Sequence, residues 1–132
     1  MGVQVRALLS VLTIEMPMTP SDDPFRELTW IDLTFWTDKQ TVAEGRAFFQ
    51  KKKIRQLAMT RTGGILAWVD AEELFATRVE YSDGDLIAEC TCQPVEAICL
   101  HAIAVVIEYI AHLKKQIAVP AALPNDARFF LL

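Results

Sequence analysis

Four side chains that favour soft metal ions lie in one short stretch of this chain. They are Cys90, Cys92, Cys99 and His101, in the order C-x-C, a loop, and C-x-H. The group contains all 3 cysteines of the chain and one of its 2 histidines. Three thiolates and one imidazole complete a tetrahedral set for zinc and leave no position for a water molecule. The pattern therefore predicts a structural zinc site, and we expect no catalytic residue and no enzymatic activity.

The residues around these ligands predict how the chain presents them. Alternation over residues 86–92 indicates a strand, which places the Cys90 and Cys92 side chains on the same face. An apolar helix is expected from Leu100 to Lys115. Cys99 should then lie in the loop or on an irregular first turn, with His101 just inside the helix. The partial positive charge of the helix N-terminus favours thiolate over thiol there.

The sequence gives less support to other roles for these side chains, but those roles stay open. A redox dithiol of Cys90 and Cys92 would leave Cys99 and His101 unexplained. An odd number of cysteines excludes a complete disulfide framework in a monomer. Cys99 and His101 are too close in sequence for a typical nucleophile and base, and no orienting acid stands beside them. The three cysteines could also be small buried apolar residues.

The rest of the pattern predicts an α+β fold. Residues 54–60, 65–70, 75–81 and 86–92 read as strands, with hairpin turns at Gly63-Gly64 and Asp83-Gly84. A helix over residues 37–52, capped by Thr37 or Asp38, precedes them. We therefore expect a small antiparallel sheet with an N-terminal helix. A strand-to-helix zinc knuckle should lead from the sheet into a C-terminal apolar helix.

The 132 residues suit one domain with flanking segments. Residues 1–24 form an apolar arm and a proline-rich linker, residues 25–115 the zinc module, and residues 116–132 a tail. We expect no signal peptide and no membrane contact, because the apolar start has a weak positive flank and no apolar run is long enough to span. Reduced thiols predict a cytoplasmic location.

The stretch CTCQPVEAICLHAIAVVIEYI resembles the SWIM zinc finger, whose signature is C-x-C followed by C-x-H on a strand-strand-helix frame. The resemblance covers roughly residues 35–113 and includes the bacterial arrangement of a helix leading into strands before the knuckle. Two positions differ from the usual pattern: Gln93 precedes Pro94, and Leu100 replaces a common lysine. Neither change removes a ligand. The resemblance implies DNA or protein as the partner. It also implies a role as the small subunit of a DNA-associated, helicase-like ATPase assembly.

Basic residues cluster before the knuckle with no acid among them. They could contact nucleic-acid phosphates, or they could form a solvated surface after the first helix. The formal net charge of −4 favours a protein over DNA as the first contact. The candidate nucleic-acid contacts are Arg46, Lys51, Lys52, Lys53, Arg55 and Arg61.

The last helix is apolar nearly all round. One stripe runs from Ala102 to Leu113 and is expected to face the sheet. A second stripe contains Leu100, Ile103 and Ile107, and it needs a cover of its own. The arm, the tail or another protein could supply it, so these three residues are candidate partner contacts.

These observations predict a non-catalytic zinc-binding module that mediates protein–protein contacts, with no small-molecule substrate. DNA binding through the basic residues from Lys51 to Arg61 is the first alternative. Thiol redox chemistry at Cys90 and Cys92 is the second.

Overall fold

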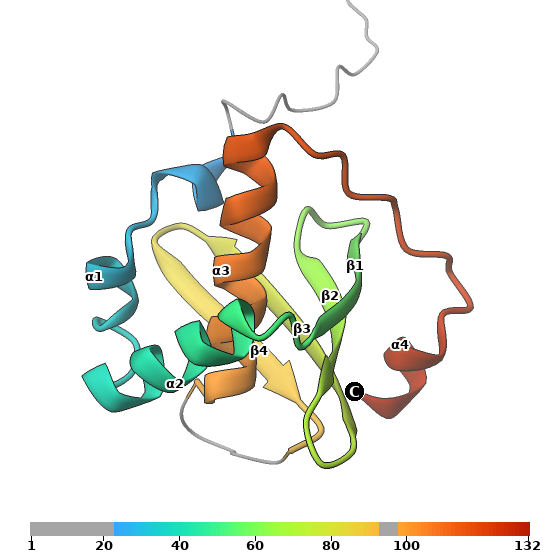
Figure 1. The fold of residues 1–132 in the computed structure, drawn as a ribbon. Coiled ribbons are helices and arrows are strands. Elements are labelled where there is room, and N and C mark those ends of the chain that lie inside the picture. Colours follow the sequence, from blue (N-terminus) through green and yellow to red (C-terminus); the bar gives the residue numbers. More distant parts are fainter. Residues whose placement is uncertain (1–22, 93–97) are drawn as a thin grey trace, which may run out of the picture.

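The computed structural model describes residues 23–92 and 98–132 of the chain. The predicted α+β class is confirmed: one antiparallel sheet with strand order β1-β2-β3-β4 is accompanied by helices (Figure 1). The strands are β1 Ile54–Met59, β2 Ile65–Asp70, β3 Leu74–Ser82 and β4 Asp85–Cys90. Each lies where the sequence pattern predicted a strand, although β4 ends two residues earlier than expected.

The two predicted helices are also present. Helix α2 spans Lys39–Gln50, and helix α3 spans Leu100–Lys115, the bounds predicted for it. Asp38 caps α2, because its carboxylate accepts a hydrogen bond from the Thr41 amide at 2.7 Å. Three short elements had no sequence prediction: the 3-10 helix η2 Pro24–Glu27, α1 Trp30–Leu33 and α4 Ala127–Leu131. The predicted arm and linker cover residues 1–24, of which residues 1–22 lie outside the described residues.

The tight turn between β3 and β4 follows from its two central residues. Asp83 and Gly84 have φ angles of 55° and 81°. Positive φ at both positions gives the mirror-image turn whose twist matches a two-stranded hairpin. The Asp-Gly prediction for this hairpin is therefore confirmed. The register that results pairs Thr77 with Cys90, which brings the first predicted ligand to the end of the sheet.

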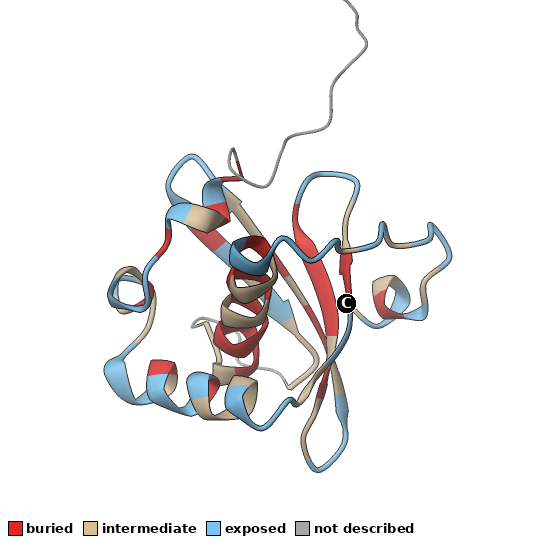
Figure 2. Ribbon diagram, turned by 45° about the horizontal axis from the view of Figure 1, so that its top comes forward, coloured by how far each residue is buried: buried red, intermediate tan, exposed pale blue. Residues whose placement is uncertain are grey.

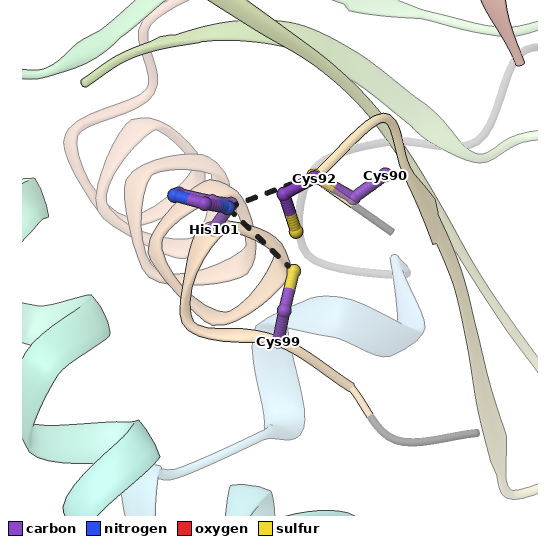
Figure 3. Close-up of side chains that lie close together, drawn as sticks. All are labelled: Cys90, Cys92, Cys99 and His101. Atoms are coloured by element: carbon purple, nitrogen blue, oxygen red, sulfur yellow. Dashed lines mark hydrogen bonds between the residues drawn. The ribbon is translucent and has the colours of Figure 1, made fainter. Parts of the chain in front are cut away.

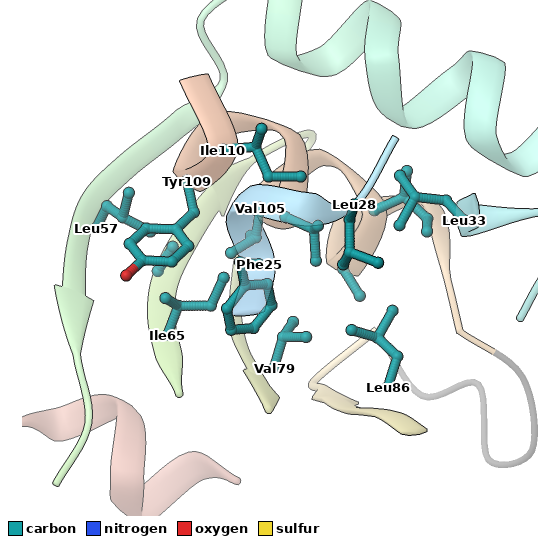
Figure 4. Close-up of a cluster of buried hydrophobic side chains, with 14 of the residues drawn as sticks. Phe25, Leu28, Leu33, Leu57, Ile65, Val79, Leu86, Val105, Tyr109 and Ile110 are labelled. Carbon is teal, nitrogen blue, oxygen red and sulfur yellow. The ribbon is translucent and has the colours of Figure 1, made fainter. Parts of the chain in front are cut away.

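Helix α3 lies across one face of the sheet, and the core forms between them (Figures 1 and 2). Ile65 on β2, Val79 on β3 and Val105 on α3 are fully buried there (Figure 4). Burying an aliphatic side chain of this size stabilises a fold by about 1.5–3 kcal/mol. The first predicted apolar stripe of α3 therefore supplies the core, as the sequence indicated.

Segment η2 closes the core at one end through a buried polar contact. The Asp23 carboxylate accepts hydrogen bonds from the Phe25 amide at 2.9 Å and from the Tyr109 hydroxyl. The Phe25 ring packs edge-on against Tyr109, with the ring centroids 5.2 Å apart. Burial and the hydrogen bond to Asp23 raise the pKa of Tyr109 above its ordinary value. The two hydrogen bonds satisfy a carboxylate that would otherwise be costly to bury.

The tail runs back along the outer edge of the sheet. The Met59 amide donates to the Pro120 carbonyl, and the Ala122 amide donates to the Met59 carbonyl, both at 2.8 Å. Arg128 on α4 is only 4% exposed, and its guanidinium donates to the Gln56 carbonyl at 2.6 Å. These contacts cover the edge of β1, which would otherwise present unpaired backbone groups.

The second stripe of α3 is covered by α2, which corrects the prediction that Ile103 contacts a partner. Ile103 is fully buried, whereas Leu100 and Ile107 are half-buried. Gly45 on α2 permits this close approach: a Cβ atom there would lie 2.7 Å from Ile103 Cγ2 and 2.9 Å from the Leu100 carbonyl oxygen. The periodicity of α3 indicates that this side is apolar, but it does not indicate that α2 covers it.

Among the helices of residues 23–92 and 98–132, none combines the length and the apolar content that a membrane crossing requires.

The contact at Gly45 gives the first prediction. In an open helix, Gly→Ala stabilises by about 1 kcal/mol. Gly45→Ala should instead lower the free energy of unfolding by about 1–3 kcal/mol, because the added methyl overpacks the α2–α3 contact. Denaturant unfolding of the variant and of the wild type measures this difference in the free energy of unfolding. Ala43→Gly, at an exposed position of the same helix, is the control and should lose about 1 kcal/mol by propensity alone. A Gly45→Ala protein more stable than wild type would contradict the close approach.

Candidate metal centre

The structure brings all four predicted ligands together where β4 meets α3. Cys90 is the last residue of β4, Cys92 lies in the turn that follows, and Cys99 and His101 stand at the start of α3 (Figure 3). One ligand atom from each residue lies within 4.8 Å of the other three. His101 Nδ1 is 3.7 Å from Cys90 Sγ and 3.9 Å from Cys99 Sγ. Zinc bond lengths set the edges of a tetrahedron of such ligands at about 3.5–3.8 Å, so the cluster needs only a small contraction around an ion.

The local backbone differs from the prediction at one ligand. Cys92 was expected on the strand beside Cys90, but the β4 ladder ends at Cys90. Thr91 accounts for the change: its amide donates to the Ala76 carbonyl, and its hydroxyl accepts from the Ala76 amide, both at 3.0 Å. These bonds turn the chain against β3, so Cys92 reaches the cluster from a turn.

The expected positions of Cys99 and His101 are confirmed, but the expected preference for thiolate at Cys99 is not, because Cys90 and burial raise its pKa. Cys99 occupies the N-cap of α3 with extended backbone, and its carbonyl accepts from the Ile103 amide at 3.1 Å. His101 lies in the first helical turn and is 9% exposed. An extended residue before the helix breaks the helical direction, which lets both side chains point toward the same centre.

Side chains of strand β3 contact the cluster and hold two of its residues in place. The Thr77 side chain is fully buried, and its hydroxyl donates a hydrogen bond to Cys90 Sγ at 3.2 Å. The His101 ring packs between two aromatic rings, with centroid distances of 4.7 Å to Phe75 and 5.6 Å to Phe48. These neighbours hold the imidazole in place with Nδ1 toward the sulfurs. Binding of an ion through Nδ1 puts the imidazole proton on Nε2.

The electrostatics of the cluster favour one thiolate among three sulfurs. A hydrogen bond from the Cys99 thiol, with help from His101 and Thr77, holds the pKa of Cys90 far below its ordinary value. Burial and the adjacent Cys90 raise the pKa of Cys92. The Cys90 contact and burial raise the pKa of Cys99 as well. A divalent cation would offset the repulsion and allow all three thiolates to form, with release of protons.

The residues that sequence reasoning missed are Thr77, Phe48 and Phe75. The alternation over residues 75–81 already put Phe75 and Thr77 on one face of a strand. Only the register of β3 with β4 shows that this face lies beneath the ligands.

The structure disperses the predicted basic residues. Lys51 and Lys52 are exposed at the end of α2, and Lys53 is half-buried. Arg55 forms an ion pair with Asp70 at 2.9 Å. The remaining two are separated from this group. Arg46 places its guanidinium 5.4 Å from the Trp30 ring centroid, while Arg61 follows β1 at its far end, about 20 Å along the strand from Lys53.

The chemistry of the donors favours some ions over others. Three sulfurs and one imidazole nitrogen can hold a metal ion, and this set suits zinc better than a hard cation such as magnesium or calcium. Comparison of the chain with family models, with curated proteins and with solved structures found no match.

The second prediction concerns metal content. Protein purified without chelator should carry one zinc ion per chain by elemental analysis, and Cys99→Ser should lose it. Cys99→Ser should also lose helical circular dichroism and melt at a lower temperature, because the ion joins α3 to the sheet. His112→Asn is the control: this second histidine lies outside the cluster, so zinc should be retained. Wild-type protein without zinc would refute the site.

The third prediction tests the hydroxyl beneath Cys90. Thr77→Val removes the hydrogen bond without leaving a cavity, and it should weaken zinc binding by about tenfold in chelator competition. Thr77→Ser keeps the hydroxyl and should stay near the wild-type affinity. Equal affinities for wild type, Thr77→Val and Thr77→Ser would show that the hydrogen bond does not influence the ligand.

Proposed function

We propose that this chain is a non-catalytic zinc-binding module of SWIM type that mediates protein–protein contacts. The observation that carries the proposal is the convergence of three sulfurs and one imidazole nitrogen within 4.8 Å. All four tetrahedral positions are filled by the protein, so an ion bound there has no open position for a substrate. Within residues 23–92 and 98–132, no second group of this kind exists that could supply metal chemistry.

The placement of the cluster explains what the ion would do. Cys90 ends the sheet and Cys99 begins α3, so one ion ties the two layers of the fold together. Zinc binding in small modules contributes about 10–16 kcal/mol of apparent free energy. An ion there would hold the surfaces of α3 and of the sheet in fixed relative positions. The proposal also implies a reducing compartment, the cytoplasm, because thiolate ligands are lost to oxidation elsewhere.

A protein partner is favoured by large apolar side chains at the surface. In and beside α1, Trp30 is 51% exposed, Ile31 is 64% exposed and Phe35 is 78% exposed. Clustered exposed apolar side chains mark interaction surfaces. The SWIM resemblance adds a context: the chain would be the small subunit of a DNA-associated ATPase assembly, held by protein contacts.

DNA is the second candidate ligand. The observation that favours it is the exposure of Lys51 and Lys52 at the end of α2. The pairing of Arg55 with Asp70 and the separation of Arg61 reduce the number of phosphates that this surface can contact.

The fourth prediction tests the role of the ion in partner binding. A protein captured by the wild-type chain in affinity purification should also be captured by His112→Asn, but not by Cys99→Ser. The reason is that the partner-binding surface depends on the zinc ion that joins α3 to the sheet. Labelled duplex DNA at about 50 mM salt should show little binding to wild type, and Lys51→Glu/Lys52→Glu should not change it. Tight, salt-sensitive DNA binding that this double variant abolishes would replace the first candidate with the second.

A further inference from the structure

A groove lies between α1, α2 and α3 and has a volume of about 470 Å³. Helices α1 and α2 stand on the same side of α3 (Figure 1). Leu33 and Ile110 are buried at the base of the groove, and Phe49 and Ile107 are half-buried along it. We name this feature the α1–α3 groove. It is lined by Leu28, Thr29, Trp30, Ile31, Leu33, Arg46, Phe49, Ile107, Ile110 and Lys114.

One wall of the groove is formed by exposed side chains. Trp30 and Ile31 on α1 line it and are 51% and 64% exposed. Exposing so much apolar surface on adjacent residues is unfavourable for an isolated domain. Tryptophan is also among the residues that contribute most to binding when a partner covers them. The groove therefore has the apolar base and the aromatic anchor of a protein interface.

The charges at the groove are of one sign. Arg46 and Lys114 line it and are exposed, and none of the lining residues among 23–92 and 98–132 is acidic. The nearest carboxylate in α1 belongs to Asp32, which accepts hydrogen bonds from the Thr29 amide and hydroxyl in the capping box of that helix. The surface is thus locally cationic on a chain whose formal net charge is −4. Charge complementarity selects an acidic partner.

We propose that the α1–α3 groove binds an amphipathic helix of a partner protein that carries acidic residues beside its apolar face. The apolar face enters between α1, α2 and α3, and the carboxylates face Arg46 and Lys114. A groove bounded by helices accepts another helix by side-chain interdigitation. The inference rests on the proposed role as a protein-binding module, and it names the surface and the chemistry of the partner.

The groove is separable from the metal centre. Ile107 follows His101 on α3 by about 9 Å along the helix axis. Substitutions at exposed groove residues therefore leave the ligands in place. This separation allows one experiment to distinguish failure of the groove from failure of the zinc module.

The test is a selection of displayed random peptides of about 16 residues on the full chain, long enough to form a helix on binding. Enriched peptides should carry bulky apolar residues at helical spacing with Asp or Glu between them. Trp30→Ala should weaken their binding about tenfold or more. Arg46→Glu/Lys114→Glu should weaken it similarly and should select basic peptides instead. Phe130→Ala, at a 78% exposed aromatic residue on α4, is the matched control and should change nothing.

The zinc content of each protein is measured in parallel. Zinc-loaded wild type that enriches no peptide over Trp30→Ala would overturn the groove proposal and leave the zinc module intact. Enriched peptides without acidic residues, or binding lost equally in Phe130→Ala, would also overturn it. Labelled duplex DNA that binds wild type and is lost in Arg46→Glu/Lys114→Glu would assign the groove to nucleic acid. Wild type without zinc would overturn the proposed function itself.

Discussion

The junction between β4 and α3 places three sulfurs and one imidazole so close together that the three thiolates do not form together without a cation. Cys90 forms a thiolate readily, but its proximity raises the pKa of Cys92 and Cys99. A divalent ion would remove this conflict and fix the direction in which α3 leaves the sheet. The other packing of the domain depends on that direction, because α3 carries the core on one side and contacts α2 on another.

Gly45 permits the contact between α2 and α3. Without a side chain there, α2 approaches α3 until Ile103 is fully buried. This approach also sets the position of Arg46 and Phe49, one and four residues further along α2. Both line the α1–α3 groove. The surface proposed for partner binding thus follows from a backbone contact between two helices.

The metal centre and the groove are formed by different kinds of contact. The centre depends on side chains close in sequence and on support from Thr77 and Phe75 of β3. The groove depends on packing among segments far apart in the chain, from Leu28 to Lys114. The exposed residues of the groove can therefore change without altering the four candidate ligands or the β3 side chains that contact them.

The sequence by itself determined the four candidate ligands, the class of the fold, and the approximate bounds of the four strands and of helices α2 and α3. The residue types and spacing of C-x-C and C-x-H indicate a site for a soft metal ion. Asp83 and Gly84 predict the hairpin turn because both residue types adopt positive φ angles. Only the tertiary structure decided that Ile103 is buried, that Thr77 lies beneath Cys90, and that Arg46 lies beside Trp30. The physical reason is that local patterns report which face of a helix or strand is apolar. They do not report which other segment covers that face, since this depends on close approaches between distant parts of the chain.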